Sequence, residues 1–332
     1  MKIEFNTDLL VLFESDNDQV YINDSNIYEL YNKLFNSIKD HKRIFIYNAN
    51  EHTKNFDTLN KIYDFLYNNK INRNSMICGI GGGITTDIAA FAASTFKRGC
   101  RLVLIPTTLL GMIDASVGGK TGINYSNIKN GIGSFYNAER IIINSDFIKT
   151  QKEANYRDGF VEIVKMSFIP QSNLCNLLSE QQSIQKIIKE AIRTKVEICS
   201  NDPHDRSSRR LLNLGHTFGH VLESVSNYEI SHGTAVAIGI RAAAKFSLQE
   251  GFITQEILKQ IEERLDKYSL PVSFHSKYLP QISKIGKSIL KQDKKADGKI
   301  NLILFNGFQS LIIHRVDNSL EIIKTLCEFA NV

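Results

Sequence analysis

Apolar and polar positions alternate along the first half of the chain in a way that predicts strands separated by helices. Five short apolar runs have the length of buried strands: 19–22, 43–47, 75–80, 102–105 and 141–143. Two intervening segments, 26–38 and 56–66, repeat apolar residues every three or four positions, as amphipathic helices do. This alternation predicts an open α/β sheet with parallel strands.

After about residue 150 the pattern changes to longer helical segments. Five helices are expected there, at 160–169, 183–199, 211–226, 233–248 and 255–268. A turn at 297–298 should lead into a strand at 300–305. The sequence therefore predicts two domains, an α/β domain over residues 1–150 and a mainly helical domain over residues 151–332.

Composition places the chain among ordinary globular proteins. Hydrophobic residues make up 42%, charged residues 23%, and the net charge is +5. No long block of like charge indicates a nucleic-acid partner, and no apolar run approaches the roughly 20 residues of a membrane span. Acidic residues precede any sustained apolar run, so no signal peptide is expected. Five scattered cysteines without a CxxC pair indicate reduced thiols and a cytoplasmic location.

Three of the eight histidines lie within seventeen residues, at His216, His220 and His232. His216 and His220 are four residues apart in a helical pattern, which places both imidazoles on one face. The string HTFGH lacks the glutamate of the HExxH zinc motif. By itself, this stretch is equally compatible with two structural histidines and an unrelated third.

Glu162 and Lys165 lie three positions apart in a segment that is apolar all round. Such a pair is usually a surface salt bridge, but the apolar neighbours predict a buried helix, where a carboxylate and an amine need strong partners. Glu162 could complete a set with His216 and His232. Two imidazoles and one carboxylate, with coordination positions left open, are typical of catalytic zinc.

A glycine-rich string, GIGGGITTD at 79–87, joins a predicted strand to a predicted helix. Glycines let the backbone approach a phosphate at the free N–H groups of the helix start. Ile84 occupies the third glycine position of the GxGxxG fingerprint, so the match to a dinucleotide loop is incomplete. The pattern favours dinucleotide binding over a plain strand-to-helix turn.

The string SVGGKTG at 116–122 resembles the end of a nucleoside-triphosphate loop. Asp114 stands where that motif needs its first glycine, and a carboxylate there would repel phosphate. We therefore reject a triphosphatase. Lys120 between glycines still suits an anion, and Lys129 with Asn130 adds a second cation and an amide.

Together these motifs resemble the 3-dehydroquinate synthase family of sugar phosphate cyclases. The strings that carry the resemblance are GGGITTD, TFKRG, IPTTLLGMIDASVGGKTGIN, KNGIGSFY, the Glu162/Lys165 helix, RRLLNLGHTFGH, the His232-Gly233 pair and DKK at 293–295. Their order and spacing agree from about residue 19 to residue 305. The likeness is therefore specific and covers nearly the whole chain.

The resemblance implies a fold, a reaction and two cofactors. An N-terminal Rossmann-like domain would bind NAD, and a mainly α-helical C-terminal domain would bind Zn²⁺ or Co²⁺ and substrate. The reaction converts 3-deoxy-arabino-heptulosonate 7-phosphate, a small phosphorylated sugar acid, to 3-dehydroquinate and phosphate in the shikimate route of aromatic amino acid biosynthesis. It proceeds by transient oxidation with NAD, phosphate elimination, re-reduction and intramolecular aldol closure. A homodimer with a shared active site is also implied.

The resemblance also assigns individual residues. The metal ligands would be Glu162, His216 and His232. NAD would contact Asp24, Asn26, Glu51, Lys54, Gly82, Gly83, Asp87, Thr107, Thr108, Asp114, Lys120 and Lys129. Substrate would contact Asp114, Lys120, Lys129, Asn130, Lys165, Lys195, Arg209, Asn213, His220 and either Lys294 or Lys295. Arg98 would reach the substrate phosphate in the neighbouring subunit.

Some positions depart from the family pattern. Asn50 replaces a common glycine, and TQKEAN at 150–155 replaces a threonine-leucine-proline string, which leaves contacts from Gln151 and Asn155 in doubt.

Three rival functions share parts of this pattern. One is another cyclase, making a valiolone or inosose from a substrate without a carboxylate. Lys195, Arg209 and the neighbouring Leu212 and Asn213 keep the dehydroquinate synthase pattern and favour that activity over this first rival. The second is a metal- and NAD-dependent alcohol or glycerol dehydrogenase, which would not need so many anion-binding cations. The third is a binding protein with a degenerate site, which would hold neither metal nor nucleotide.

Overall fold

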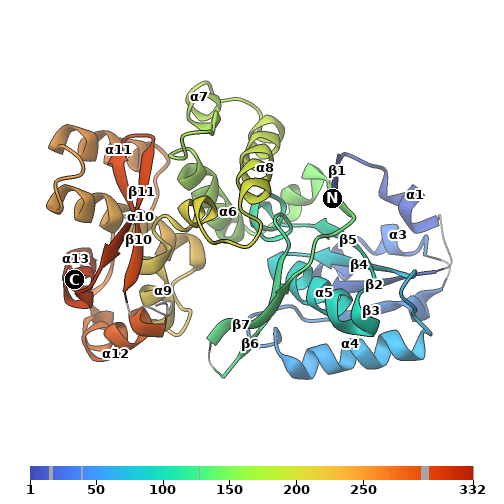
Figure 1. Cartoon of the computed structure of the whole chain (residues 1–332). Helices are drawn as coiled ribbons and strands as arrows, with labels where there is room; N and C mark the ends of the chain where they lie inside the picture. Colours follow the sequence, from blue (N-terminus) through green and yellow to red (C-terminus); the bar gives the residue numbers. More distant parts are fainter. Residues whose placement is uncertain (15–17, 39, 127, 293–298, 332) are drawn as a thin grey trace. The chain divides into compact units, whose positions relative to one another are not determined.

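The computed structural model, drawn in Figure 1, describes residues 1–14, 18–38, 40–126, 128–292 and 299–331. The chain divides into two compact units, Met1–Tyr156 and Arg157–Val332, here called unit 1 and unit 2. The division falls inside helix α6 (Glu153–Met166), six residues beyond the expected boundary at residue 150 (156 − 150). The helix that the apolar pattern placed at 160–169 thus begins at Glu153 and ends at Met166.

Unit 1 is built on a six-stranded parallel sheet in the order β1-β8-β5-β4-β2-β3. Its strands are β1 (Lys2–Phe5), β2 (Gln19–Asp24), β3 (Ile44–Tyr47), β4 (Met76–Gly81), β5 (Arg101–Pro106) and β8 (Arg140–Ile143). All five predicted strands form, and the parallel α/β sheet is confirmed. Strand β1 was not predicted, because its four residues alternate charged and apolar side chains over too short a stretch.

Helices cover both faces of this sheet. The helical elements of unit 1 are α1 (Leu9–Glu14), α2 (Ser25–Leu30), α3 (Asn32–Phe35), η1 (His41–Arg43), α4 (Phe56–Asn68), α5 (Gly83–Thr95), η2 (Phe96–Arg98), the π-helical η3 (Gly111–Ala115) and η4 (Ser145–Thr150). Helices α4 and α5 lie on one face (Figure 1). Phe13 of α1 packs edge-on against Tyr21 on the other.

The helix expected at 26–38 is interrupted. Tyr31 separates α2 from α3, and its φ of −118° and ψ of 31° are not helical. Its ring packs edge-on against Phe147 at 4.8 Å, and its hydroxyl lies 2.7 Å from Oγ1 of Thr150. These tertiary contacts come from a segment more than one hundred residues away, so helical periodicity could not reveal them.

The direction in which successive strands are added to the sheet changes between β2 and β4. From β2 it continues to β3 on one side, and from β4 it continues to β5 on the other. In open parallel sheets such a switch point opens a crevice at the carboxyl ends of the two strands, where ligands bind. Those ends here are Asp24 and Gly81, the latter followed directly by helix α5.

A two-stranded antiparallel hairpin, β6 (Lys120–Tyr125) and β7 (Ile128–Phe135), completes unit 1. It was not predicted, because its glycines and lysines suggested an anion-binding loop. Gly122 and Gly133 face each other in the register, and a Cβ on Gly133 would lie 2.1 Å from the carbonyl oxygen of Thr121. The glycines therefore let the two strands approach closely.

Unit 2 is mainly helical and is organised around α10 (His232–Gln249). This helix packs against α9, α11, α13 and β10, and most of its side chains are buried. The elements of unit 2 after α6 are α7 (Leu174–Ser179), α8 (Ile184–Asn201), η5 (Ser208–Asn213), α9 (His216–Val225), α10, α11 (Gln255–Lys267), β9 (Phe274–His275), η6 (Ser276–Tyr278), α12 (Leu279–Gln292), β10 (Ile300–Gly307), β11 (Ser310–Val316), α13 (Ser319–Cys327) and β12 (Ala330–Asn331). The predicted strand at 300–305 forms β10, while the turn expected at 297–298 lies outside the described residues.

The helix expected at 211–226 starts later than its periodicity suggested. Residues up to Asn213 form the 3₁₀ element η5, and Gly215 adopts a left-handed φ of 78° before α9 begins at His216. The carbonyl of Gly215 rests against α10 at Gly239, where a Cβ would lie 2.0 Å from that oxygen. Two glycines thus let the start of α9 touch the backbone of α10, which fixes where His216 is presented.

Two simple properties complete the description. Within the described residues, no helix combines the length and the apolar character required to cross a membrane. All five cysteines lie in the described residues, and Cys78, Cys100 and Cys199 are buried.

The contact between α9 and α10 yields a stability prediction. Gly239→Ala should lower the free energy of unfolding by about 3 kcal/mol or more, because the new methyl group meets backbone that cannot rotate away. Gly251→Ala is the matched control. Gly251 has a φ of +75° but open space around it, so only the left-handed backbone penalises the change, by about 1–2 kcal/mol. Urea unfolding of both variants measures the difference, and equal losses would contradict the close-contact interpretation.

Candidate metal centre and cofactor loop

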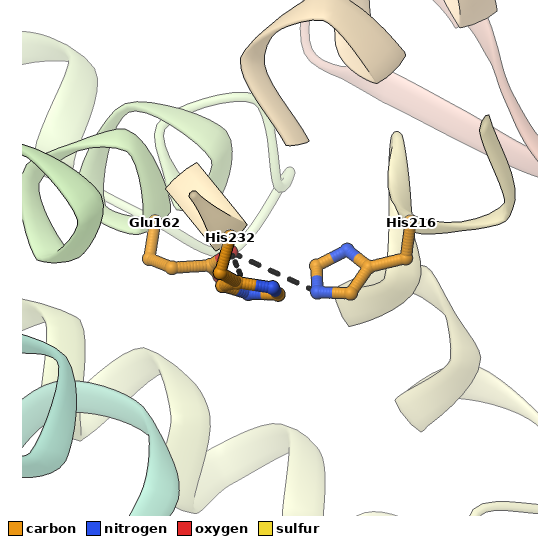
Figure 2. Close-up of side chains that lie close together, drawn as sticks. All are labelled: Glu162, His216 and His232. Atoms are coloured by element: carbon orange, nitrogen blue, oxygen red, sulfur yellow. Dashed lines mark ion pairs between the residues drawn. The ribbon is translucent and has the colours of Figure 1, made fainter. Parts of the chain in front are cut away.

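Glu162, His216 and His232 converge in unit 2, each from the start or middle of a different helix. Figure 2 shows their side chains pointing toward one another, Glu162 from α6, His216 from the first residue of α9 and His232 from the first residue of α10. Oε1 of Glu162 lies 3.7 Å from Nε2 of His216 and 3.5 Å from Nε2 of His232. One candidate ligand atom from each residue lies within 4.8 Å of the other two.

This geometry fits a divalent metal. Nitrogen and oxygen ligands lie roughly 2.0–2.2 Å from zinc, which separates neighbouring ligands of a tetrahedron by about 3.4 Å. Glu162 is completely buried. The Lys165 ammonium pairs with its Oε2, while Oε1 faces the two imidazoles and has no hydrogen-bond partner among the described residues. Buried polar atoms without such a partner are unusual and need an explanation. An ion held by three protein ligands, with further positions open, would satisfy this oxygen.

The second nitrogen of each imidazole is already engaged. Nδ1 of His232 lies 3.2 Å from Oε1 of Glu223, and Nδ1 of His216 lies 3.2 Å from the backbone oxygen of Leu214. A ring that donates from Nδ1 presents Nε2 as the metal-binding atom. Carboxylate and backbone acceptors of this kind commonly orient metal-binding histidines. Both rings are therefore aimed before any ion arrives.

The two histidines of the triad have pKa values shifted in opposite directions. Burial and the Lys165 ammonium lower the pKa of His216 to about 3, so this ring is neutral and able to bind metal. Burial alone would lower the pKa of His232, but its contacts with Glu162 and Glu223 raise it to about 10. Burial would likewise raise the pKa of Glu162, yet Lys165 and both imidazoles hold it well below its usual value. The carboxylate is thus charged.

Among its described residues, unit 2 buries four Lys or Arg side chains, and three of them are predicted substrate contacts. Lys165 is 2% exposed and forms an ion pair with Oε2 of Glu162, one turn away on α6. Lys195 on α8 and Arg209 in η5 are 6% and 3% exposed, and the fourth, Arg241, pairs with Asp266. Burying positive charge is costly unless an opposite charge pairs with it.

The loop that carries Arg209 is fixed by Asp202. Its carboxylate accepts hydrogen bonds from the backbone N–H groups of Arg206, Ser207 and Arg209, at 2.9, 2.6 and 3.1 Å. These donors hold the pKa of Asp202 at about 2. Nη1 of Arg209 also donates to the carbonyl of Pro203 at 3.0 Å. The backbone of Arg209 and one nitrogen of its guanidinium are therefore both held by this loop.

His220 lies one turn after His216 on α9, and their ring centroids are 5.6 Å apart at nearly perpendicular planes. The prediction that these two imidazoles share a helix face is confirmed. Asn213 is the last residue of η5 and precedes the left-handed Gly215. The lysine expected from DKK, Lys294 or Lys295, lies outside the described residues.

In unit 1, predicted cofactor residues gather at the carboxyl ends of β2, β4 and β5. Asp24 caps α2 and accepts from the backbone and side chain of Asn26, both at 3.2 Å. Gly82 caps α5 and lies against Thr108, where a Cβ would meet its methyl group at 3.2 Å. Just after β5, the buried hydroxyl of Thr107 has no hydrogen-bond partner among the described residues. These positions match the switch point between β2 and β4.

A polar network joins the start of helix α5, which follows the glycine-rich loop at residues 81–83, to the hairpin β6–β7. Nζ of Lys54 lies 2.5 Å from both Asp87 of α5 and Oδ1 of Asn130 in β7. Glu51 lies 3.7 Å from Lys129 and accepts from the amide of Asn124 at 2.9 Å. Burial raises the pKa of Asp87, although Lys54 opposes the shift. The structure thus brings together five of the predicted residues, Glu51, Lys54, Asp87, Lys129 and Asn130.

Four further predicted residues also lie in unit 1. Asp114 lies in η3, close enough to Asp87 to raise its pKa slightly. Lys120 is exposed at the start of β6. Arg98 is exposed in the turn after α5, with a left-handed φ of 64°. Gly83, the first residue of α5, approaches Ala115, where a Cβ would meet the alanine methyl group at 3.1 Å.

Sequence reasoning missed two polar residues that hold this chemistry in place. Glu223 contacts His232. It lies seven residues after His216 on α9, so two helical turns place Glu223 and His216 on the same side of that helix. That spacing was a usable signal. Asn124 joins Glu51 to Asn130, accepting from the Asn130 backbone at 2.9 Å. No local pattern marks Asn124, because its partners lie on the loop before α4 and across the hairpin.

Comparisons with known proteins agree along the chain. Two family models match, described as 3-dehydroquinate synthase N-terminal over residues 44–158 and 3-dehydroquinate synthase C-terminal over residues 159–296. A 3-dehydroquinate synthase of Prochlorococcus marinus (strain MIT 9215) is 37% identical over 301 residues, covering 85% of this chain and 82% of the relative.

Two solved structures share the fold. One is a 2-epi-5-epi-valiolone synthase from Streptomyces hygroscopicus with NAD⁺ and Zn²⁺ bound, with a TM-score of 0.84 and 24% identity over 99% of this chain and 96% of that one. The other is a 2-deoxy-scyllo-inosose synthase complexed with carbaglucose-6-phosphate, NAD⁺ and Co²⁺. Its TM-score is 0.81 at 21% identity over 98% of this chain and 96% of that one.

The contact between Glu223 and His232 predicts a loss of metal affinity. Glu223→Ala should weaken Zn²⁺ binding about 10- to 100-fold, because the imidazole loses the acceptor that orients it. Glu229→Ala, which removes an exposed carboxylate paired with Lys277, should leave the affinity unchanged. Competition with a chelating dye measures both constants. Unchanged affinity in Glu223→Ala would contradict the orienting role.

Proposed function

The chain belongs to the 3-dehydroquinate synthase family, and we propose that the residues described above carry out its reaction with NAD and one divalent metal ion. The enzyme converts 3-deoxy-arabino-heptulosonate 7-phosphate to 3-dehydroquinate and phosphate. The observation that carries the assignment of the site is the Glu162–His216–His232 triad, whose candidate ligand atoms all lie within 4.8 Å of one another and include a fully buried carboxylate. When bound, the metal would polarise a substrate oxygen and NAD would accept and return a hydride.

The nucleotide is assigned to the carboxyl end of the sheet in unit 1. The start of α5 offers free N–H groups for a pyrophosphate, and Gly82 and Gly83 leave room for its approach. The buried, unpartnered hydroxyl of Thr107 supports a polar ligand group at that edge. The remaining proposed contacts are Asp24, Asn26, Glu51, Lys54, Asp87, Thr108, Asp114, Lys120 and Lys129. NAD⁺ bound in the inosose and valiolone synthases of the same fold supports the choice of nucleotide.

The carboxylate and the phosphate of the substrate are assigned to lysine and arginine side chains. In unit 2, Lys165, Lys195 and Arg209 are buried, so their attraction for a carboxylate or phosphate is weakly screened. Asn213 and His220 would complete the polar contacts there. The substrate contacts proposed within unit 1 are Asp114, Lys120, Lys129 and Asn130. Fixed cations of this kind orient a flexible sugar phosphate and stabilise the charge of the departing phosphate.

We assign the substrate carboxylate to Arg209, and this assignment can be tested by substrate choice. The protein with NAD and Zn²⁺ should release phosphate from the heptulosonate phosphate without accumulating NADH, since the hydride returns within each turnover. Sedoheptulose 7-phosphate, which lacks the carboxylate, should react poorly. Net NADH formation would indicate a dehydrogenase instead, and equal turnover of both substrates would indicate a cyclase of the valiolone type.

Arg209→Ala should lower kcat/KM for the heptulosonate phosphate roughly 10²-fold and raise KM, about the loss of one charge-assisted contact. Arg210→Ala is the matched control, because this half-buried neighbour donates instead to the backbone of Asp205. It should leave kcat/KM close to that of the parent. Similar losses in both variants would point to a disturbed loop rather than a lost substrate contact.

We also propose a homodimer in which Arg98 acts in the partner's site, in a reducing compartment such as the cytoplasm. Arg98 is exposed, and the adjacent Gly99 lies against Tyr136, next to Phe135, which is 49% exposed. The same hairpin exposes Tyr125 and Ile128. Exposed apolar side chains thus occur at both ends of the hairpin, Phe135 at the end near Gly99 and Tyr125 with Ile128 at the turn, and they support an interface with a second copy. The five scattered cysteines, without a CxxC pair, support the reducing compartment.

Complementation between two inactive variants tests the shared site. Arg98→Ala and Lys165→Ala should each be inactive alone, but co-expressed subunits should regain part of the activity. A mixed dimer contains one site with both residues intact if Arg98 acts in trans and Lys165 in its own subunit. Mass spectrometry of the purified mixture confirms that mixed dimers form. Mixed dimers without activity, or a fully active monomer, would contradict the proposal.

A further inference from the structure

We propose that Asp158 is a positioning residue that holds His232 in place for the metal by fastening the start of α10 to α6. This inference rests on the metal site proposed above and extends it to a residue outside the ligand set. Asp158 lies four residues before Glu162 on α6, about 6 Å along the helix axis and on the same face. One helix would therefore supply a metal ligand and, one turn earlier, the anchor for another.

The anchor consists of two hydrogen bonds to one carboxylate oxygen. Oδ1 of Asp158 accepts from the hydroxyl of Ser231 at 2.7 Å and from the backbone N–H of Gly233 at 3.0 Å. These residues flank His232 on both sides. Ser231 is also the N-cap of α10 and accepts from the N–H of Thr234. The backbone around His232 is thus held from within α10 and from α6.

Close packing at the same point limits how far α10 can move. A Cβ on Gly233 would lie 2.4 Å from the Cα of Asp158, so the two helices meet backbone to backbone. Glycine is required there for steric reasons alone. Because His232 is the first residue of α10, a shift of this junction would carry its Cα with it.

The two helices that supply the other ligands therefore share the task of placing His232. Helix α6 provides Glu162 as a ligand and Asp158 as an anchor for the backbone. Helix α9 provides His216 as a ligand and Glu223 as the partner of the His232 ring, at 3.2 Å from Nδ1. The imidazole is fixed by its ring and by its main chain, and the second of these depends on Asp158.

The test measures Zn²⁺ affinity by dye competition, and the ligand-field spectrum with Co²⁺, on metal-stripped full-length protein. Asp158→Ala should weaken Zn²⁺ binding about 10- to 100-fold, the usual effect of losing an outer partner, and should change the Co²⁺ bands. Asp158→Asn should stay close to the parent, because its amide oxygen still accepts both hydrogen bonds. His216→Ala, which removes a ligand, serves as the reference for a damaged site.

A matched control separates positioning from stability. Asp266→Ala removes another carboxylate that anchors α10, through Arg241 in the middle of the helix at 2.7 Å. It should lower the unfolding midpoint in urea without changing Zn²⁺ affinity or the Co²⁺ bands. If Asp266→Ala weakens Zn²⁺ as much as Asp158→Ala does, the effect belongs to the helix as a whole and the proposal fails.

Each remaining outcome also decides the question. Parent-like Zn²⁺ affinity in Asp158→Ala beside weak binding in His216→Ala would overturn the anchor while leaving the metal site intact. Parent-like binding in both variants would overturn the metal site itself. Loss of binding in Asp158→Asn equal to that in Asp158→Ala would assign the effect to charge and overturn the hydrogen-bonded anchor. If circular dichroism shows that Asp158→Ala is unfolded, Ser231→Ala removes the 2.7 Å bond together with the side-chain cap of α10, and unchanged affinity there would refute the anchor.

Discussion

A fully buried carboxylate must be neutralised, and in unit 2 this requirement falls on Glu162. Moving such a charge out of water costs several kcal/mol unless positive partners surround it. The Lys165 ammonium meets one of its oxygens, and two imidazoles face the other at 3.5 and 3.7 Å. Much of the local arrangement follows from this need, including the burial of Lys165 and the convergence of three helices on one point.

The same requirement makes the first residues of α9 and α10 more important for placing the two imidazoles than the rest of these helices. His216 and His232 are each the first residue of a helix, where the backbone is held by caps and neighbouring elements rather than by its own turns. Gly215 in its left-handed conformation turns the chain into α9 against α10. A ligand at such a position is only as well placed as the junction behind it.

The sequence predicted the larger elements of this fold and the grouping of Glu162, His216 and His232, and it failed where distant residues decide local structure. Strands of the parallel sheet are continuous apolar runs, which periodicity identifies without knowledge of their neighbours. The break at Tyr31 and the 3₁₀ start before His216 could not be predicted, because they depend on Phe147 and Gly239. Hairpin β6–β7 was hidden by its glycines. Asn124 has no distinctive spacing, since its role arises only when the hairpin meets the loop before α4.

The network at Lys54 has a thermodynamic consequence for unit 1. The Lys54 ammonium contacts both Asp87, near the start of α5 and just after the glycine-rich loop, and Asn130 on the hairpin. A ligand that binds Asp87 or its neighbours more tightly when the hairpin is docked must, by the same free energy, favour the docked hairpin when it binds. For such a ligand, docking of the hairpin and binding at the glycine-rich loop would be two expressions of one equilibrium.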